Sequence, residues 1–275
     1  MRLSVLSDHR VGIWSLRKQR TNKAGEMFKR DMSAPDYPYY NDQPARMAWL
    51  DWFIILIALV IGFTVLTAVP HIVWLSETAD GVLRSILFAA IPLGAYAWRA
   101  GVHWTVIFNG WRWSYLWWGL LFGVINLVFT YAIGIFALGR MNLVNNSVGE
   151  GLSNGIIPGG PALFYLRTGL QLFGEEVFTI LPFLFLLWLG VKVLDLTRDG
   201  AILLAWIGSA LIFGAMHLPG YGWNVAQALL LIGPIRLVLT LAYMKTKSIW
   251  ASTIAHVLND WSMFTLLMVV NALRT

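Results

Sequence analysis

The run GLQLFGEEVFTILPFLFLLWL, residues 169–189, decides the fold. It is almost wholly apolar and long enough to cross a bilayer, whose hydrocarbon core of ~30 Å takes roughly 20 residues of helix. Two adjacent carboxylates, Glu175 and Glu176, interrupt it. An ionisable group at such a position costs a few kcal/mol in hydrocarbon, so it marks a candidate functional site. The run therefore predicts a transmembrane helix that carries part of a site.

Six further apolar runs accompany this one. The whole chain is 58% hydrophobic and 12% charged, with a mean hydropathy of +0.65, whereas a soluble domain is about 45–50% apolar and about 25% charged. The sequence predicts an all-α, polytopic transmembrane helix bundle of about seven helices, with six to eight as the range, over residues 47–275. The other runs lie at residues 48–70, 83–98, 114–138, 200–217, 224–243 and 248–272.

Residues 1–46 differ from the rest because they are polar and basic, and we expect a partly disordered cytoplasmic tail. Prolines 35, 38 and 44 predict an extended linker near anionic headgroups over residues 33–44. Lysines and arginines of the short connections fall on the same side as this tail, which favours a cytoplasmic amino terminus in a bacterial cell membrane. Basic residues in such places give no support to nucleic-acid binding. The chain has no cysteine, so a thiolate nucleophile and Cys-bound zinc are excluded.

Ionisable side chains inside the apolar runs are few, and they recur at helical spacing. Burial and like charge disfavour ionisation of at least one of the paired glutamates, which brings its gain and loss of a proton towards neutral pH, the range suited to a general base. Residues four apart share a helix face, which pairs a histidine with an aspartate in the last run and a phenylalanine with a histidine in the fifth. The arginine of the sixth run is expected to be the counter-ion of a buried acid. The candidate residues in these patterns, with the uncharged Phe213 and Asn259 included, are Glu175, Glu176, Phe213, His217, Arg236, His256, Asn259 and Asp260.

In their order and spacing these motifs resemble the CPBP family of intramembrane proteases, over about residues 165–265. The family includes type II CAAX prenyl endopeptidases and bacterial proteins linked to bacteriocin processing and self-immunity. Its motifs are E-E-x-x-x-R, F-x-x-x-H and H-x-x-x-N or D, matched here by Glu175-Glu176, Phe213 to His217 and His256 to Asp260. One position departs from the pattern, because Ile180 stands where the family has arginine. Arg236 could supply the missing positive charge from a neighbouring helix.

The resemblance implies an endopeptidase that hydrolyses a peptide bond in a membrane-associated protein or peptide. Glu175 and His217 would activate a water, with Glu176 beside them, and His256 and Asp260 would bind the oxyanion. An ionised aspartate can only accept hydrogen bonds, so Asn259 could be the donor instead. Glu175, His217 and His256 could also hold Zn²⁺. The sequence leaves open the choice between metal-dependent and metal-free chemistry, and it leaves open the oligomeric state.

Other functions remain as alternatives. A degenerate family member could act without catalysis, as a membrane immunity or scaffold protein, and glutamate–histidine chains also relay protons in transporters. No internal repeat supports a transporter of the inverted-repeat type. No H-E-x-x-H motif is present, as a zincin-type membrane enzyme would need. Ser209 and His256 could form a serine–histidine dyad, but Ser209 lacks the usual glycine after it.

Overall fold

Seven helical spans form the part of the chain that the computed structural model describes, residues 36–274. Each is long and apolar enough to cross a membrane, which confirms the predicted all-α polytopic bundle. They are α2 (Trp49–Thr67), α3 (Glu77–Ala100) continued by the short helix η1 (Gly101–Ile107), α4 (Trp113–Ala137), α6 (Gly160–Lys192), α7 (Arg198–Met216), the combined α8 (Val225–Gln227), η3 (Ala228–Ile232) and α9 (Gly233–Thr246), and α10 (Ile249–Ala272).

Two spans are longer than their apolar runs. The second extends through η1 to Ile107, and α6 begins at Gly160 rather than at residue 169. Gly159 has φ +74, which a glycine adopts without strain, and Pro161 occupies the first turn of α6, where its missing N–H costs nothing. A short helix, α5 (Ser147–Ser153), lies in the connection before α6. Hydropathy locates the apolar centre of a span, whereas local backbone chemistry sets its ends.

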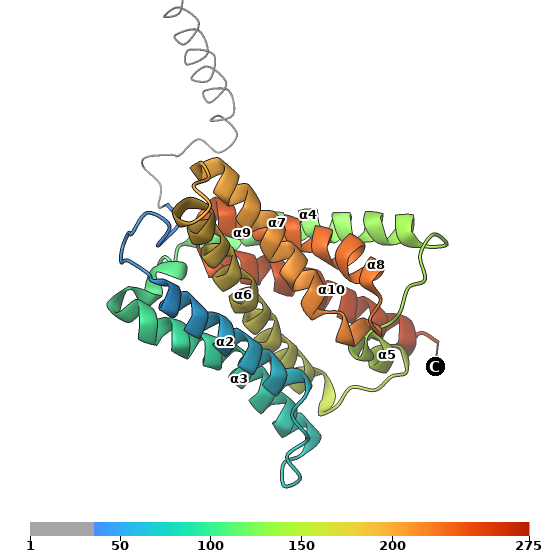
Figure 1. Ribbon diagram of the computed structural model, residues 1–275. Helices are drawn as coiled ribbons and strands as arrows, with labels where there is room; N and C mark the ends of the chain where they lie inside the picture. The colour runs from blue at the N-terminus through green and yellow to red at the C-terminus, as the bar shows by residue number, and fades with distance from the viewer. Residues whose placement is uncertain (1–35, 275) are drawn as a thin grey trace, which may run out of the picture.

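Helix α6 is the central helix of the bundle. All of its residues from Gly174 to Leu184 are buried, although such a long run in a surface helix would expose one face. Helices α2 and α3 lie side by side along one flank of α6, and α7 and α10 pack on its other sides (Figure 1). Helix α9 packs against α4, α7 and α10. The two glutamates predicted to be functional therefore lie inside protein rather than against lipid.

Helix α4 packs on α10 through a seam of small residues. Gly119 and Gly123 face Ala251 and Ala255, so the two backbones approach closely. A Cβ atom added at Gly119 would lie 2.7 Å from the Cβ of Ile254 and 2.9 Å from the carbonyl oxygen of Ala251. The seam continues into polar residues, since Thr130 Oγ1 donates to Asn259 Oδ1 at 3.3 Å. Helix α4 thereby reaches the candidate site on α10.

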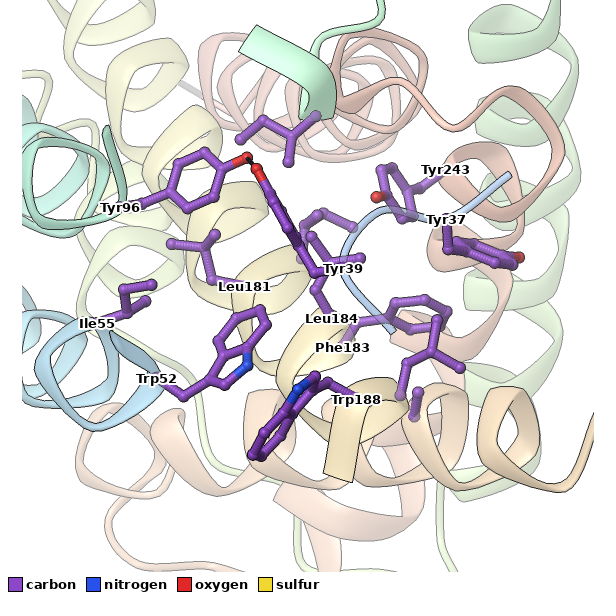
Figure 2. Close-up of a cluster of buried hydrophobic side chains, with 14 of the residues drawn as sticks. Tyr37, Tyr39, Trp52, Ile55, Tyr96, Leu181, Phe183, Leu184, Trp188 and Tyr243 are labelled. Carbon is purple, nitrogen blue, oxygen red and sulfur yellow. Dashed lines mark hydrogen bonds between the residues drawn. The ribbon is translucent and has the colours of Figure 1, made fainter. Parts of the chain in front are cut away.

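The segment before α2 packs into one end of the bundle, which the polar-tail interpretation did not anticipate. Tyr37, Tyr39 and Tyr40 are all buried. The hydroxyls of Tyr39 and Tyr96 meet at 2.7 Å, as Figure 2 shows, and the Tyr39 ring lies edge-on to Trp52. The prolines keep the segment out of a helix, but tyrosine rings gain from burial once each hydroxyl has a partner. Residues 1–35 of the predicted tail lie outside the described residues.

Basic side chains hold this segment in place. Arg198 NH2 and Asp36 Oδ1 are 2.6 Å apart, and Lys192 Nζ lies 2.6 Å from Asp42 Oδ2. Lys247, between α9 and α10, places its Nζ 4.1 Å from the centre of the Tyr37 ring and donates to the carbonyl oxygen of Met244. These interactions tie the connections after α6 and α9 to the segment before α2, all at one end of the bundle.

Substitution of Gly119 by leucine should separate α4 from α10. The new side chain would meet Ile254 and a backbone carbonyl, and overpacking of this kind costs about 1–3 kcal/mol. Gly134→Leu is the matched control, because it lies in the same helix with nothing within 4 Å of an added Cβ. The free energy of unfolding in mixed micelles measures the difference. Equal effects of the two substitutions would contradict a close α4–α10 seam.

Stability should rise with pH above about 8 through Lys247. Burial lowers the pKa of Lys247 from its usual 10.5 to about 8. Between these values the unfolded chain binds a proton that the folded chain has released, so the free energy of unfolding increases with pH. Lys247→Met should remove this increase and stabilise the protein at pH 7 by about 1–2 kcal/mol. Lys245→Met, at an exposed neighbouring position, should keep the increase in stability with pH. Thermal unfolding between pH 7 and 11 measures this increase in each variant. If Lys247→Met kept the wild-type pH dependence, the increase would not come from Lys247.

Candidate active site

A buried ion pair forms the base of the candidate site. Arg236 NH1 lies 2.5 Å from Glu176 Oε1, and Arg236 NH2 lies 2.8 Å from Glu176 Oε2. Both side chains are 0% exposed, and a two-pronged contact of this kind is the strongest form that an arginine–carboxylate pair takes. The predicted counter-ion of a buried acid is thus confirmed for Arg236. Ile180, at the position of the family arginine, is buried in the apolar core.

Glu176 also orients the imidazole of His256. The Nδ1 atom of His256 lies 2.8 Å from Glu176 Oε1. An ionised carboxylate only accepts hydrogen bonds, so Nδ1 carries the proton and donates it. The other ring nitrogen, Nε2, therefore points away from the ion pair and towards Glu175 and Asp260, at 3.8 Å from an oxygen of each. A carboxylate that fixes a histidine tautomer in this way is a recurrent feature of catalytic sites.

His217 is held in the same manner from the other side. Its Nδ1 lies 2.8 Å from the carbonyl oxygen of Phe213, one turn back along α7. A carbonyl oxygen is also an acceptor only, so the proton of neutral His217 is at Nδ1 and its Nε2 is a free acceptor. Helix α7 ends at Met216, and Pro219 starts the turn η2 (Pro219–Tyr221). The end of the helix leaves the imidazole beside α6.

Glu175 lies between the two histidines. Its Oε2 is 3.9 Å from His217 Nε2 and 3.8 Å from His256 Nε2. These separations exceed a direct hydrogen bond and fit one water within reach of all three atoms. The other carboxylate oxygen, Oε1, accepts a hydrogen bond from Gln171 Nε2 at 3.0 Å. One oxygen of Glu175 is thus fixed, and the other faces the space between the imidazoles.

Asp260 lies on the more exposed side of the site, and the buried Asn259 lies beside it. Asn259 Nδ2 donates to Asp260 Oδ1 at 2.9 Å, so one N–H of the alternative oxyanion donor is already engaged. The structure brings together all of the predicted catalytic residues, Glu175, Glu176, His217, His256 and Asp260, together with the supporting residues Phe213, Arg236 and Asn259.

Solvent exposure increases from the base of the cluster to its opening. The side chains of Glu176 and Arg236 are fully buried, whereas that of Glu175 is 7% exposed. Those of His217 and Asp260 reach 22% and 28%. A peptide would therefore approach from the side of His217 and Asp260, with the ion pair sealed behind the reacting groups.

Sequence reasoning missed several polar neighbours of the site. Gln171 precedes Glu175 by one helical turn, a spacing that could have indicated it. No spacing pattern in the sequence indicated Tyr221, although its ring centre lies 6.3 Å from that of His217. Burial raises the pKa of Tyr221; the hydrogen bond from Asn146 lowers it, and the charges of Asp260 and Glu175 raise it again. Because Asn146 Nδ2 donates to the Tyr221 oxygen at 2.9 Å, the phenol proton is free to donate at the opening.

Among residues 36–274, no group of three or more histidine, aspartate or glutamate side chains is placed so that it could hold a metal ion. The set that the sequence suggested for Zn²⁺, Glu175, His217 and His256, lies within these residues.

The family comparison agrees with the motifs. Residues 161–262 match a family described as type II CAAX prenyl endopeptidase Rce1-like. This segment runs from the start of α6 into α10 and holds every predicted site residue, which confirms the resemblance seen in the sequence. No curated protein and no solved structure matches the chain.

Removal of Arg236 alone should be more damaging than removal of the whole ion pair. Arg236→Met leaves Glu176 buried without a counter-ion, which costs about 3–5 kcal/mol. The double variant Glu176→Gln/Arg236→Met has no uncompensated charge and should recover most of that stability. The free energy of unfolding in mixed micelles measures both variants. A double variant no more stable than Arg236→Met would show that the pair is not the stabilising interaction described.

Proposed function

We propose that this Rce1-like membrane protein is an intramembrane endopeptidase that hydrolyses a peptide bond with a water activated by Glu175 and His217. One observation carries the proposal. Glu175 Oε2 lies at nearly equal distances from the Nε2 atoms of His217 and His256, and both Nδ1 atoms are occupied by fixed acceptors. Both imidazoles thus direct their second nitrogen to the same point, where a nucleophilic water would be bound.

In our proposal, protein groups at these positions carry out the hydrolysis. Glu175 takes a proton from the water as its oxygen bonds to the peptide carbonyl carbon, with His217 accepting a hydrogen bond from the same water. The carbonyl oxygen becomes an oxyanion that N–H or O–H donors at the opening stabilise, with protonated His256 Nε2 as the first candidate. The C–N bond then breaks, and the proton held by Glu175 passes to the leaving nitrogen. The products are a carboxylic acid and an amine, between which a proton can then pass.

Arg236 takes the place of the arginine that the family has at position 180. Its guanidinium holds Glu176, and Glu176 in turn holds the Nδ1 proton of His256. A positive charge delivered from α9 can do this as well as one delivered from α6, because the requirement is a cation at the carboxylate and not a particular helix. Ile180 is therefore compatible with activity in our proposal.

The substrate is a membrane-associated peptide or protein, reached from within or beside the bilayer. Cleavage of a CAAX-like terminus and processing of a bacteriocin both fall in this class. Lys192, Arg198 and Lys247 gather at the end of the bundle that holds residues 36–47. Under the positive-inside rule this end is cytoplasmic. The amino terminus would then be cytoplasmic and the glutamate–histidine cluster nearer the opposite face.

Glu175→Gln should lower the rate of cleavage by about a thousandfold, because glutamine cannot accept the proton of the water. Membranes that contain wild type or the variant are compared for peptides released across the proteome, and the peptides found are then tested with purified protein in detergent. Glu150→Gln is the matched control, since Glu150 is an exposed glutamate on α5.

Two results would contradict the proposal. If wild type and Glu175→Gln released the same peptides, the chain would be a non-catalytic immunity or scaffold protein. If a chelator abolished cleavage and Zn²⁺ restored it, the enzyme would be a metalloprotease, and the water would be activated differently.

A further inference from the structure

A cavity of about 230 Å³, lined by both polar and apolar residues, lies beside the start of α6. Ser147 and Gly151 of α5 line one side of it, and Phe164 and Arg167 of α6 line the other. The site described above does not include any of these residues.

Arg167 is the unusual member of the lining. It is partly buried, and within residues 36–274 its guanidinium makes no hydrogen bond and no ion pair. Other arginines of the spans have carboxylate partners, such as Arg84 with Asp80 and Arg99 with Asp51. A partly desolvated cation without a counter-ion is costly, so an anion from outside the chain would be bound with a gain in free energy.

The Arg167 side chain packs against α3. Its stem crosses α3 at Gly81, where an added Cβ would lie 2.9 Å from Arg167 Cδ. The missing side chain at Gly81 therefore gives the Arg167 stem room to reach the cavity that its side chain lines.

The connection before α5 is bonded to residues near the candidate active site. The backbone N–H and C=O of Val144 both bond the side-chain amide of Gln227, at 2.8 and 2.9 Å. Asn146, which caps α5, bonds Tyr221 beside His217. Helix α5, which lines the cavity, is thus tied to the segment that follows His217.

Arg167, Gln171 and Glu175 are successive positions on one face of α6. At 1.5 Å per residue, Arg167 lies about 12 Å along the helix from Glu175. An extended peptide spans that distance with three to four residues. A peptide placed with one bond at Glu175 would thus bring a group three to four residues away to Arg167.

We propose that Arg167 and this cavity form a subsite that binds a carboxylate of the peptide substrate, three to four residues from the bond that is cut. The inference rests on the proposed endopeptidase function and adds to it the residue that sets where the peptide lies. The carboxylate is the chain terminus of the peptide or an acidic side chain. A lipid phosphate offers related chemistry, and the test separates the two.

The test measures binding, so it does not depend on cleavage. The full-length Glu175→Gln protein in detergent is titrated with a fluorescent peptide of alanine, leucine and glycine that ends in a free carboxylate, and with the same peptide ending in an amide. The carboxylate peptide should bind about tenfold tighter or more, the worth of a charge-assisted hydrogen bond. Arg167→Gln should erase the difference, and Arg167→Lys should keep part of it.

Arg140→Gln is the matched control. Arg140 follows α4 and is exposed, with its guanidinium over the ring of Phe136 and bonded to that residue's carbonyl oxygen. It lies outside the cavity, so its loss should leave the preference for the carboxylate unchanged.

Three outcomes would overturn the subsite. Equal affinity for the two peptides would do so, as would a preference that survives Arg167→Gln. The third is a preference seen in nanodiscs of phosphatidylcholine but lost when phosphatidylglycerol is added, which would assign the cavity to a lipid phosphate. Failure of the subsite leaves Glu175-dependent cleavage intact, whereas failure of the proposed function appears as cleavage that does not depend on Glu175.

Discussion

The buried pair of Arg236 and Glu176 is the interaction on which the rest of the site depends. Each charge alone in the middle of a membrane bundle would cost a few kcal/mol. Together they fix α9 against α6, and the same carboxylate holds the Nδ1 proton of His256 on α10. The Glu176 carboxylate thereby fixes the rotation of α6, α9 and α10 relative to one another. The pair contributes little net stability against an apolar alternative, so its main effect is to specify geometry.

In that geometry some polar groups orient a neighbouring side chain, and others are the groups to which our proposal assigns the reaction. Glu176, the Phe213 carbonyl and Gln171 each use their hydrogen bonds to orient a neighbour. His217, His256 and one oxygen of Glu175 keep an unengaged atom facing the same small volume. The ion pair of Glu176 and Arg236 is fully buried, whereas the side chains of His217 and Asp260 are partly exposed. In the proposed mechanism, a peptide bond would therefore reach the cluster without displacing the charges of the ion pair.

Hydropathy and spacing predicted the parts of this protein that depend on single helices. The number of spans follows from the cost of polar groups in hydrocarbon, and ionisable residues inside apolar runs mark the candidate site because they are costly there. The pairing of His256 with Glu176 could not be predicted, since it depends on how α10 is rotated against α6. Residues 36–47 likewise make contacts with distant segments that their own sequence does not predict. Their prolines and charges suggested a linker. The burial of Tyr37 depends on its contacts with α6 and α9, and that of Tyr39 on its contacts with α2 and α3.

Ile180 shows why a motif is a poorer guide than the charge balance that it represents. The family pattern places arginine four residues after the second glutamate, and this chain places isoleucine there. Taken as a missing residue, the change argues against activity. Taken as a charge balance, it requires only that a cation reach Glu176 from some other element, and Arg236 of α9 does so with two contacts. Position 180 is then free to pack in the apolar core, where an unpaired arginine would have been excluded. The two positions are therefore coupled: an arginine at position 180 would gain nothing unless Arg236 were lost.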